Sequence, residues 1–366
     1  MGNGTQKVKL MQNQSLMDTE NCMKSERMSA LMAGFEGKRV VVVGDIMLDE
    51  YIWGQTNRIS PEAPVMVVEA KRQSQVPGGA ANVVNNLCAL GAIGIVIGAV
   101  GDDESGRALT AALQGKGADT TGVIVLTDRP TTRKTRIVAH SQQVVRVDYE
   151  TQEPLDEGGA GRLGELLEEL VPGADAILIS DYQKGVISPE LLRVCVRLSR
   201  LYEKPLMGNL KPSMLREGCG LTMITLNLLE ASQAVGRRSL ETDDKLQAAG
   251  KALLERTGAE NMVITQGARG LTVFSACTPN DPLFVPAQPV EVFDPAGAGD
   301  TVISTMTLAL VAGASPAEAA ILATHAAAAA VKKLGVSTVT RTEITDSFQR
   351  SCEPTALVAA GDLAMA

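Results

Sequence analysis

The sequence is poor in aromatic residues, in histidine and in paired cysteines. Phe, Trp and Tyr together make up 3% of the 366 residues, and there are 2 histidines. The 6 cysteines include no Cys-x-x-Cys pair, which argues against a zinc site and against a disulfide framework. No apolar run approaches the roughly 20 residues of a membrane-spanning helix, so we expect no membrane association and a soluble, cytoplasmic protein with reduced thiols.

An excess of positive charge is also missing. The net charge of −8 argues against a nucleic-acid partner, although local basic clusters leave small anionic substrates open. Residues 1–36 lack the apolar core of a signal peptide and are rich in Met, Gln, Asn, Ser and Lys. We therefore expect a disordered or loosely helical N-terminal extension at 1–36 and a C-terminal tail at 347–366.

Strand-like runs alternate with helix-like segments through most of the chain. The β-branched runs at 38–44 and 93–100 predict buried strands of a parallel sheet. Helical segments are expected at 77–90, 162–170 and 189–202, and further strands at 176–180, 206–209, 262–264 and 290–293. This alternation predicts an α/β fold, a doubly wound and mainly parallel sheet flanked by helices, in one domain at 37–346.

Two regions break this rhythm. Apolar and polar residues alternate at 65–70 and at 133–149, which is typical of an antiparallel sheet with one wet face. We expect a small β-sheet lid beside the main domain, built from about 50–72 and 131–150.

The segment Asp294-Pro-Ala-Gly-Ala-Gly-Asp300-Thr301 joins a predicted strand to an apolar helix. Small residues let the backbone approach a ligand, and the free amides of a helix start attract anions. Backbone donors at Gly297, Ala298 and Gly299 could stabilise a phosphoryl group in transfer, while Asp300 accepts the proton of a hydroxyl. The alternative is an ordinary turn in which Asp300 only caps the helix.

Polar residues near the first strand suit a polyol ligand. Gly78 and Gly79 lead into a helix with Asn82 one turn inside, and Asp45 and Asp49 follow the first strand, at the sheet edge where open α/β sheets bind ligands. The alternatives are a plain strand-to-helix turn and solvent-facing loop acids.

These motifs together resemble the two signatures of the PfkB (ribokinase-like) carbohydrate-kinase family over residues 38–345. Within that family the strings Gly44-Asp-x-Met-Leu-Asp49, Arg58-Ile-Ser-Pro-Glu-Ala-Pro-Val65 and Asp181-Tyr-x-Lys-Gly185 are similar to those of the D-glycero-β-D-manno-heptose 7-phosphate kinases. The resemblance implies Asp300 as general base, amides of residues 297–299 as anion hole, and Asp45, Asp49, Gly78, Gly79 and Asn82 around the sugar.

The resemblance also implies a nucleotide side. Asn227 and Glu230 match the family's Asn-x-x-Glu, with Glu230 positioning Mg²⁺ through water. Thr265, Gly267 and Gly270 resemble its nucleotide loop. The implied cofactors are ATP and Mg²⁺, with a monovalent cation as a further option. Arg136 is the candidate for the phosphate of a sugar phosphate. It belongs to the basic cluster Arg133, Lys134, Arg136 and Arg146, and such a run is more often a solvated face.

Three positions depart from the heptose-kinase pattern. Asn209 replaces an aspartate, Ala296 replaces Thr or Ser, and Thr324 stands where an Asn is usual. They bear on nucleotide affinity, metal handling and the acceptor, not on the base.

The favoured hypothesis is transfer of the γ-phosphate of ATP to the anomeric hydroxyl of heptose 7-phosphate. The product would be the 1,7-bisphosphate used for ADP-heptose, and the resemblance implies a homodimer. One alternative is a kinase of another sugar or sugar phosphate, and another is a non-catalytic sugar- or nucleotide-binding relative. An NAD-binding enzyme is disfavoured because no Gly-x-Gly-x-x-Gly follows the first strand.

Overall fold

The computed structural model describes residues 25–140, 142–217 and 220–352. The expectations for residues 1–24 and 353–366 fall outside this part of the chain. Across the described residues, no helix is both long and apolar enough to span a membrane.

The main domain is built on one sheet of 9 strands in the order β13-β12-β11-β10-β9-β8-β1-β4-β5. Its strands are β1 (Arg39–Gly44), β4 (Ile93–Gly101), β5 (Asp119–Leu126), β8 (Ala176–Ser180), β9 (Leu206–Asn209), β10 (Met223–Asn227), β11 (Asn261–Thr265), β12 (Gly270–Ser275) and β13 (Leu283–Pro286). The strands from β5 to β11 pair in parallel, and β12 and β13 are antiparallel. The predicted doubly wound, mainly parallel sheet is confirmed.

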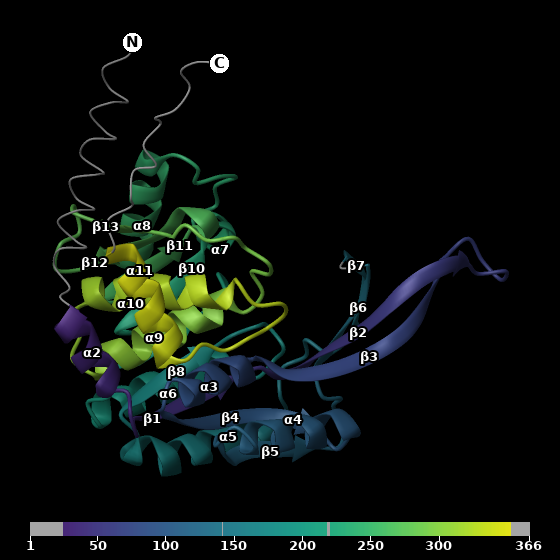
Figure 1. The fold of residues 1–366 in the computed structure, drawn as a ribbon. Coiled ribbons are helices and arrows are strands. Elements are labelled where there is room, and N and C mark those ends of the chain that lie inside the picture. The colour runs from purple at the N-terminus through teal and green to yellow at the C-terminus, as the bar shows by residue number, and fades with distance from the viewer. Residues whose placement is uncertain (1–24, 141, 218–219, 353–366) are drawn as a thin grey trace, which may run out of the picture.

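Helices cover both faces of this sheet (Figure 1). One face carries α2 (Ser25–Ala33), α3 (Ala80–Ala89), α4 (Glu104–Gln114), α9 (Ala298–Val311), α10 (Pro316–Ala330) and α11 (Arg341–Cys352). The other carries α5 (Glu157–Leu170), α6 (Pro189–Leu201), α7 (Leu228–Ala234) and α8 (Asp243–Thr257). Short 3₁₀ turns lie at Val171–Gly173 and Gly267–Arg269.

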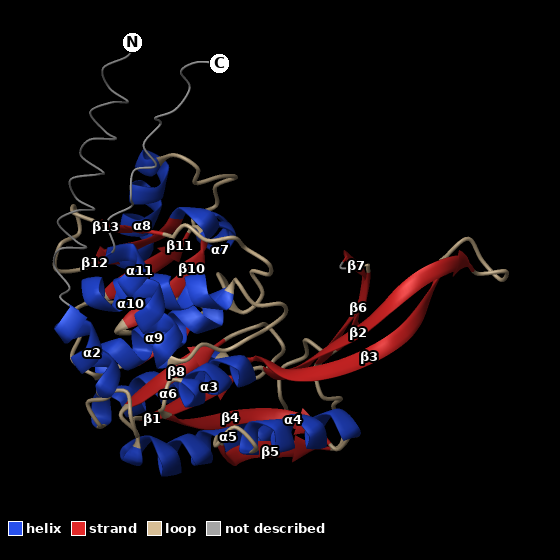
Figure 2. Cartoon of the chain, in the orientation of Figure 1, coloured by secondary structure: helices blue, strands red, loops and turns tan. Residues whose placement is uncertain are grey.

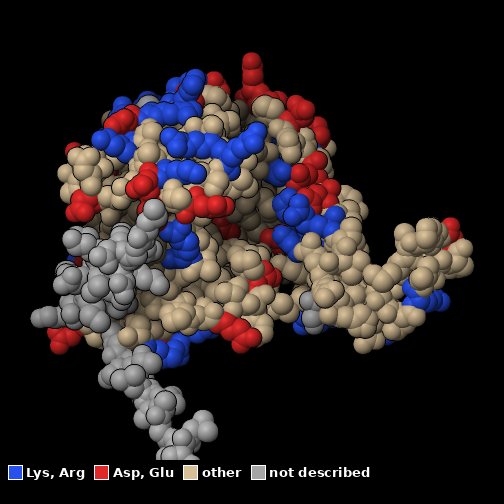
Figure 3. Space-filling view, turned by 90° about the horizontal axis from the view of Figure 1, so that it is seen from above, with Lys and Arg blue, Asp and Glu red and all other residues tan. Residues whose placement is uncertain are grey.

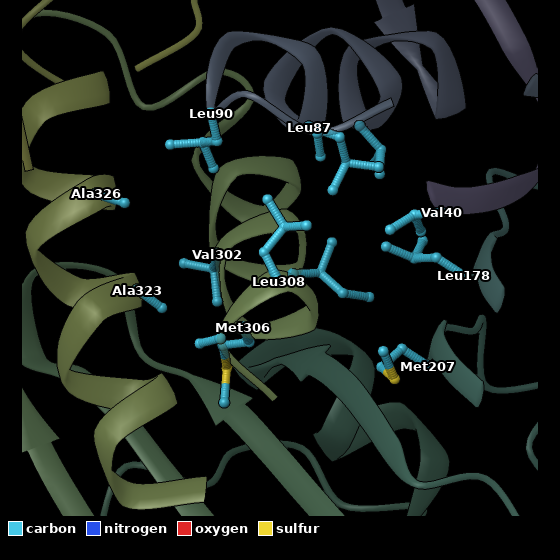
Figure 4. Packing of buried hydrophobic residues seen from close by; sticks show 14 of the residues in the cluster. Val40, Leu87, Leu90, Leu178, Met207, Val302, Met306, Leu308, Ala323 and Ala326 are labelled. Carbon is cyan, nitrogen blue, oxygen red and sulfur yellow. The ribbon is translucent and has the colours of Figure 1, made fainter. Parts of the chain in front are cut away.

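The alternation along β1 explains the two hydrophobic cores. Val40 and Val42 belong to the cluster under α9 and α10, whereas Val41 and Val43 belong to the opposite cluster, because successive strand residues point to opposite faces. Both faces are buried, which accounts for the unbroken apolar run. In the first cluster Val40 lies near Leu178, across from the residues of α9 (Figure 4).

The second sheet has 4 strands in the order β3-β2-β6-β7 and leaves the main domain as an arm (Figure 2). Its strands are β2 (Ile46–Ile59), β3 (Met66–Gly79), β6 (Arg133–Ala139) and β7 (Gln142–Tyr149). The small sheet beside the main domain is therefore confirmed, but it is not antiparallel throughout, because β2 and β6 pair in parallel. Its first two strands span 46–79, which is wider than the expected 50–72. We call this sheet the lid; that it closes over a ligand stays a prediction.

The expected disorder of the N-terminal extension is wrong for its described part, because α2 is packed onto the main domain. Met28, Leu31 and Phe35 are 0–1% exposed. Within α2, Leu31 and Met32 lie 3 and 4 residues after Met28 and form an apolar stripe with it on one helix face. The polar composition of the segment as a whole obscures this stripe. At the other end, α11 continues to Cys352, past the expected domain end at 346.

The strand expected at 290–293 is also wrong. This segment is a loop without strand pairing, held by the amide of Phe293, which donates to the carbonyl of Val331 at 2.8 Å. Its backbone is bonded to the end of α10 instead of to β13, the edge strand of the main sheet.

Candidate active site

Polar residues gather where the parallel strands of the main sheet end. Asp45 follows β1, Asp181 and Tyr182 follow β8, Lys211 follows β9 by two residues, and Asn227 and Thr265 are the last residues of β10 and β11. Parallel strands bring these ends to one edge of the sheet, which is where open α/β sheets bind ligands. The start of α9 lies at the same edge, because Gly297 and Asp300 line a cavity together with Asn227 and Thr265.

The start of α9 needs glycine at 297. Gly297 has φ 80° and precedes the first helical residue, Ala298. A Cβ there would lie 2.9 Å from the side-chain nitrogen of Asn82, so the loop can approach α3 only without a side chain. Of the three predicted anion-hole amides, that of Ala298 already donates to the carbonyl of Pro295 at 3.2 Å. Gly297 and Gly299 line the cavity beside Asp300, so their amides remain the better candidates for the anion hole.

Asp300 is held by two hydrogen bonds in a buried position. Asn82 Nδ2 donates to Oδ2 at 2.7 Å, and the Tyr182 hydroxyl donates to Oδ1 at 2.6 Å. Burial raises the pKa of Asp300 to about 6, against the opposing effect of these two donors. Such a carboxylate is ionised at neutral pH yet basic enough to accept a proton, as a general base must be.

A polar cavity of about 180 Å³ opens beside Asp300. It is lined by Tyr182, Asn209, Lys211, Thr225, Leu226, Asn227, Glu230, Thr265, Gly297, Gly299, Asp300 and Val302. Asn209 Oδ1 and Thr225 Oγ1 are buried here without a hydrogen-bond partner among the described residues. Unsatisfied buried oxygens are costly, which indicates that a ligand, ion or water completes the site.

Asn227 and Glu230 form a reciprocal capping box at the start of α7. Asn227 Oδ1 accepts from the amide of Glu230 at 2.9 Å, and Glu230 Oε2 accepts from the amide of Asn227 at 2.9 Å. Glu230 Oε1 pairs with Lys211 Nζ at 2.5 Å. Asn227 and Glu230, both predicted, therefore line the cavity, and the Lys211 ammonium lies beside the Glu230 carboxylate.

A larger, mainly apolar cavity of about 630 Å³ adjoins the first, and Thr265, Gly299 and Val302 line both. The predicted nucleotide residues Gly267 and Gly270 lie in its wall, as do Val331 and two alanines of α10, Ala327 and Ala328. Gly270 has φ 110°, and a Cβ there would collide with the backbone of residues 285–287, so the turn itself requires glycine. The Thr324 hydroxyl donates to the carbonyl of Ile321 at 2.8 Å and so is engaged within its own helix.

Two predicted sugar ligands have other partners. The Asp45 carboxylate accepts hydrogen bonds from the amides of residues 182, 184 and 186 and is 1% exposed. Asn82 is fully buried; its Nδ2 donates to Asp300 and its Oδ1 accepts from Asn86 at 3.2 Å. Asn82 Nδ2 keeps a second N–H, and Asp45 Oδ1 keeps a second lone pair, so their contact with a sugar stays a prediction. Asp45 orders a loop, and Asn82 orients Asp300.

Asp49, Gly78, Gly79 and Arg136 meet at the root of the lid. Asp49 Oδ1 pairs with Arg136 Nη1 at 2.5 Å, and burial raises the pKa of Asp49 against the effect of that cation. A Cβ at Gly78 would collide with the Asp49 carboxylate, so glycine there lets β3 pass close to it. Gly79 has φ 57° and abuts the carbonyl of Asp45.

Charged groups surround this lid root. Lys134 pairs with Asp148 at 3.2 Å and with Glu150 at 2.9 Å, and Lys184 pairs with Glu150 at 2.7 Å. Acidic and basic side chains adjoin each other beside a hollow where the lid meets the main domain (Figure 3). The predicted basic cluster is therefore largely paired with acids rather than an open anion site.

Sequence reasoning missed Tyr182 and Lys211 as site residues. Tyr182 contacts Asp300, and Lys211 contacts Glu230 and lies 5.3 Å from the centre of the Tyr182 ring. Each follows the end of a parallel strand, which was the signal that could have found them.

The chain is similar to known proteins over most of its length. The chain is 41% identical over 333 residues to "Bifunctional protein HldE" of Desulfatibacillum aliphaticivorans, covering 91% of this chain and 66% of that protein. It is 40% identical over 326 residues to "Bifunctional protein HldE" of Geobacter sulfurreducens, covering 89% of this chain and 66% of that protein. The chain thus spans somewhat less than two thirds of the length of these relatives.

Solved structures show the same fold at low identity. Arabidopsis thaliana ribokinase complexed with ribose and ATP superposes with a TM-score of 0.68 at 19% identity, covering 86% of this chain and 99% of that one. Escherichia coli phosphofructokinase-2 in complex with substrates and products gives 0.73 at 19% identity, covering 86% and 99%. The fold is therefore ribokinase-like. The profile of the "pfkB family carbohydrate kinase" matches residues 38–343, and the chain belongs to that family.

Proposed function

We propose that this protein transfers the γ-phosphate of ATP to a hydroxyl group of a sugar, with Asp300 as the general base. The observation that carries the proposal is the position of Asp300. Its buried carboxylate lies on the first turn of α9, where a small polar cavity adjoins a larger apolar one. The polar cavity suits the phosphates and the apolar cavity suits the base of a nucleotide.

We propose D-glycero-β-D-manno-heptose 7-phosphate as the acceptor and its anomeric hydroxyl as the group phosphorylated. The support is the set of heptose-kinase-like strings, the 40–41% identity to the two HldE proteins, and the charged lid root beside Asp49. A sugar phosphate would have to displace acids from Lys134 or Arg136 to use their charge.

In the proposed reaction Asp300 takes the proton of the acceptor hydroxyl. The acceptor oxygen then forms a bond to the γ-phosphorus, and the bond from that phosphorus to the β–γ bridging oxygen breaks, releasing ADP. The partial positive charge at the start of α9 and the ammonium of Lys211 lie on the same cavity, where they can stabilise the charge on the transferring group.

The residues present fit a magnesium ion that the nucleotide brings with it. No group of three or more His, Cys, Asp or Glu side chains among the described residues could hold a metal by itself. The unpartnered oxygens of Asn209 and Thr225 and the carboxylate of Glu230 are hard ligands suited to Mg²⁺ or to its waters. Bound there, Mg²⁺ would neutralise phosphate charge. For a monovalent cation no residue is assigned.

The test is ADP release by the purified protein with ATP and Mg²⁺ across a panel of sugars and sugar phosphates. Asp300→Asn should lower kcat by roughly 10²–10⁴ while nucleotide binding, measured by calorimetry, stays within a few fold. If the wild type phosphorylated only another sugar of the panel, that sugar and not heptose 7-phosphate would be the acceptor. Binding without turnover on any acceptor would indicate a non-catalytic relative, which the Asn209 substitution makes worth testing.

We also propose a homodimer that forms through the lid and functions in the cytoplasm. Ile59, Met66, Val145 and Tyr149 on the lid are 46–70% exposed, and a second copy would cover such apolar side chains. Light scattering should show a dimer that Val145→Lys weakens. A monomeric wild type would contradict this.

A further inference from the structure

We propose that Tyr182 is a positioning residue for Asp300, presented by a loop that two buried carboxylates hold in a strained conformation. The loop is residues 181–186, between β8 and α6. The inference rests on the proposed function, because it takes Asp300 to be the base.

Asp45 is the first of the two carboxylates. Its Oδ2 accepts from the amides of Tyr182 at 2.7 Å and Lys184 at 3.1 Å, and its Oδ1 accepts from the amide of Val186 at 3.1 Å. Three backbone donors from one short loop therefore converge on one carboxylate. Such charge-assisted bonds in a buried place are strong and fix the path of the backbone.

Asp181 is the second and is 2% exposed. Its Oδ1 accepts from the amide of Gln183 at 2.8 Å, and its Oδ2 accepts from the amide of Lys211 at 3.1 Å. Asp181 thus ties the Tyr182 loop to the segment that carries Lys211. The two side chains that face Asp300 and Glu230 are placed by one carboxylate.

The backbone of the loop is strained. Gln183 has φ 55°, one of the non-glycine residues with positive φ among those described, and Gly185 has φ 86°. A Cβ at Gly185 would collide with the carbonyl of Glu153, and Arg129 donates to the carbonyls of both Glu153 and Lys184. Strain of this kind persists only where surrounding contacts impose it, and it clusters at functional sites.

The loop delivers one polar group to the candidate active site, the Tyr182 hydroxyl. It donates to Asp300 Oδ1 at 2.6 Å, and the Lys211 ammonium lies against its ring. Burial and the charge of Asp300 raise the pKa of Tyr182 well above 10, so the hydroxyl stays a donor. With Asn82 on Oδ2, this bond fixes the plane of the carboxylate and leaves a second lone pair on each oxygen for the acceptor hydroxyl.

Groups from several elements act on the charge of Asp300. Asp49 on β2 raises its pKa, whereas Lys211, Tyr182 and Asn82 lower it, and burial has the largest effect. Glu230 lies beyond Lys211 and is paired with it. Removing the Tyr182 hydroxyl removes one donor to the ionised form and leaves the other groups in place.

The experiment is the pH dependence of kcat for Tyr182→Phe, with Tyr202→Phe as a control at an exposed tyrosine. The acidic limb should move to higher pH by roughly half to one unit in Tyr182→Phe, and kcat at pH 8 should fall about 3- to 30-fold. The KM for ATP should stay within about twofold. Tyr202→Phe should match the wild type.

An unchanged acidic limb in Tyr182→Phe would overturn the inference, whether kcat is unchanged or falls equally at every pH. Asp45→Asn is a second variant, because it weakens the loop and leaves the hydroxyl present; it should shift the limb in the same direction. Asp300→Asn distinguishes failure of the proposed function from failure of this inference. If it retains wild-type kcat, the proposed function fails, whereas an inactive Asp300→Asn with a wild-type profile in Tyr182→Phe contradicts only this inference.

Discussion

Lys211 Nζ lies 2.5 Å from Oε1 of Glu230, and the two side chains join the segment after β9 to the start of α7 across the polar cavity. Both side chains are mostly buried, so each charge depends on the other for its electrostatic stabilisation. Removing one partner of a buried pair leaves the remaining charge uncompensated.

Lys211→Met should therefore impair catalysis and stability together. We expect kcat to fall by roughly 10- to 1000-fold, because a charge near the transferring phosphate is lost. The melting temperature should also fall. The control is Lys71→Met on the lid, where Lys71 and its partner Glu69 are both exposed, and it should change neither quantity. Wild-type kcat in Lys211→Met would remove Lys211 from the proposed active site.

The pH profile of the wild type should show one ionisation on its acidic side. Burial raises the pKa of Asp300 to about 6, so kcat/KM should halve near pH 6 and then fall about tenfold per unit below it. Initial rates at constant free Mg²⁺, with coupling enzymes in excess, measure this limb. A flat profile down to pH 5 would mean that Asp300 is not the base.

Asp300 should also cost stability at the pH at which the protein works. Its folded-state pKa of about 6 exceeds the ordinary 3.8, so its stabilising contribution is complete below about pH 4 and is lost as pH rises through 6. Asp300→Asn keeps a neutral side chain at every pH. It should unfold with a free energy higher by roughly 1–3 kcal/mol at pH 8, and the gain should vanish near pH 4. Urea unfolding at both pH values tests the sign, and a constant difference would contradict it.

The N-terminal helix should behave as part of the folded domain. Phe35, two residues after the end of α2, is fully buried, and Phe35→Ala should lower the free energy of unfolding by about 3–5 kcal/mol. Phe293→Ala is the matched control because that ring is 64% exposed, and it should change stability by less than about 1 kcal/mol. Equal effects of the two substitutions in thermal unfolding would restore the view of an unattached extension.

Local patterns predicted β1, β4, β8, β9 and β11 of the main sheet and missed β5, β10, β12 and β13. The β-branched run of β1 and the alternating residues of β6 and β7 each match one kind of strand, so period alone separated the two sheets. Residues 290–293 misled because a short apolar run also suits a loop over a cavity. Only long-range packing decides between the two.

The residues of the candidate site could be predicted from the sequence better than the contacts that these residues make. Gly297, Gly299 and Asp300 at the start of α9 carry their own signal in the sequence, since backbone geometry restricts the residue types there. The partners of Asp45 and Asn82 carry no such signal. A buried carboxylate or amide has the same sequence signature whether it contacts a sugar or a backbone amide. Tyr182 acquires its position only through the loop that Asp45 holds.

The hydrogen bond between Asn82 and Asp300 joins residues 218 positions apart. Contacts of such sequence separation form late, because closing a long loop is entropically costly. During synthesis, the base cannot acquire this partner until residue 300 has left the ribosome, and every strand of the main sheet precedes that residue. Nascent chains would therefore expose an unfinished cleft that cannot consume nucleotide before α9 is in place.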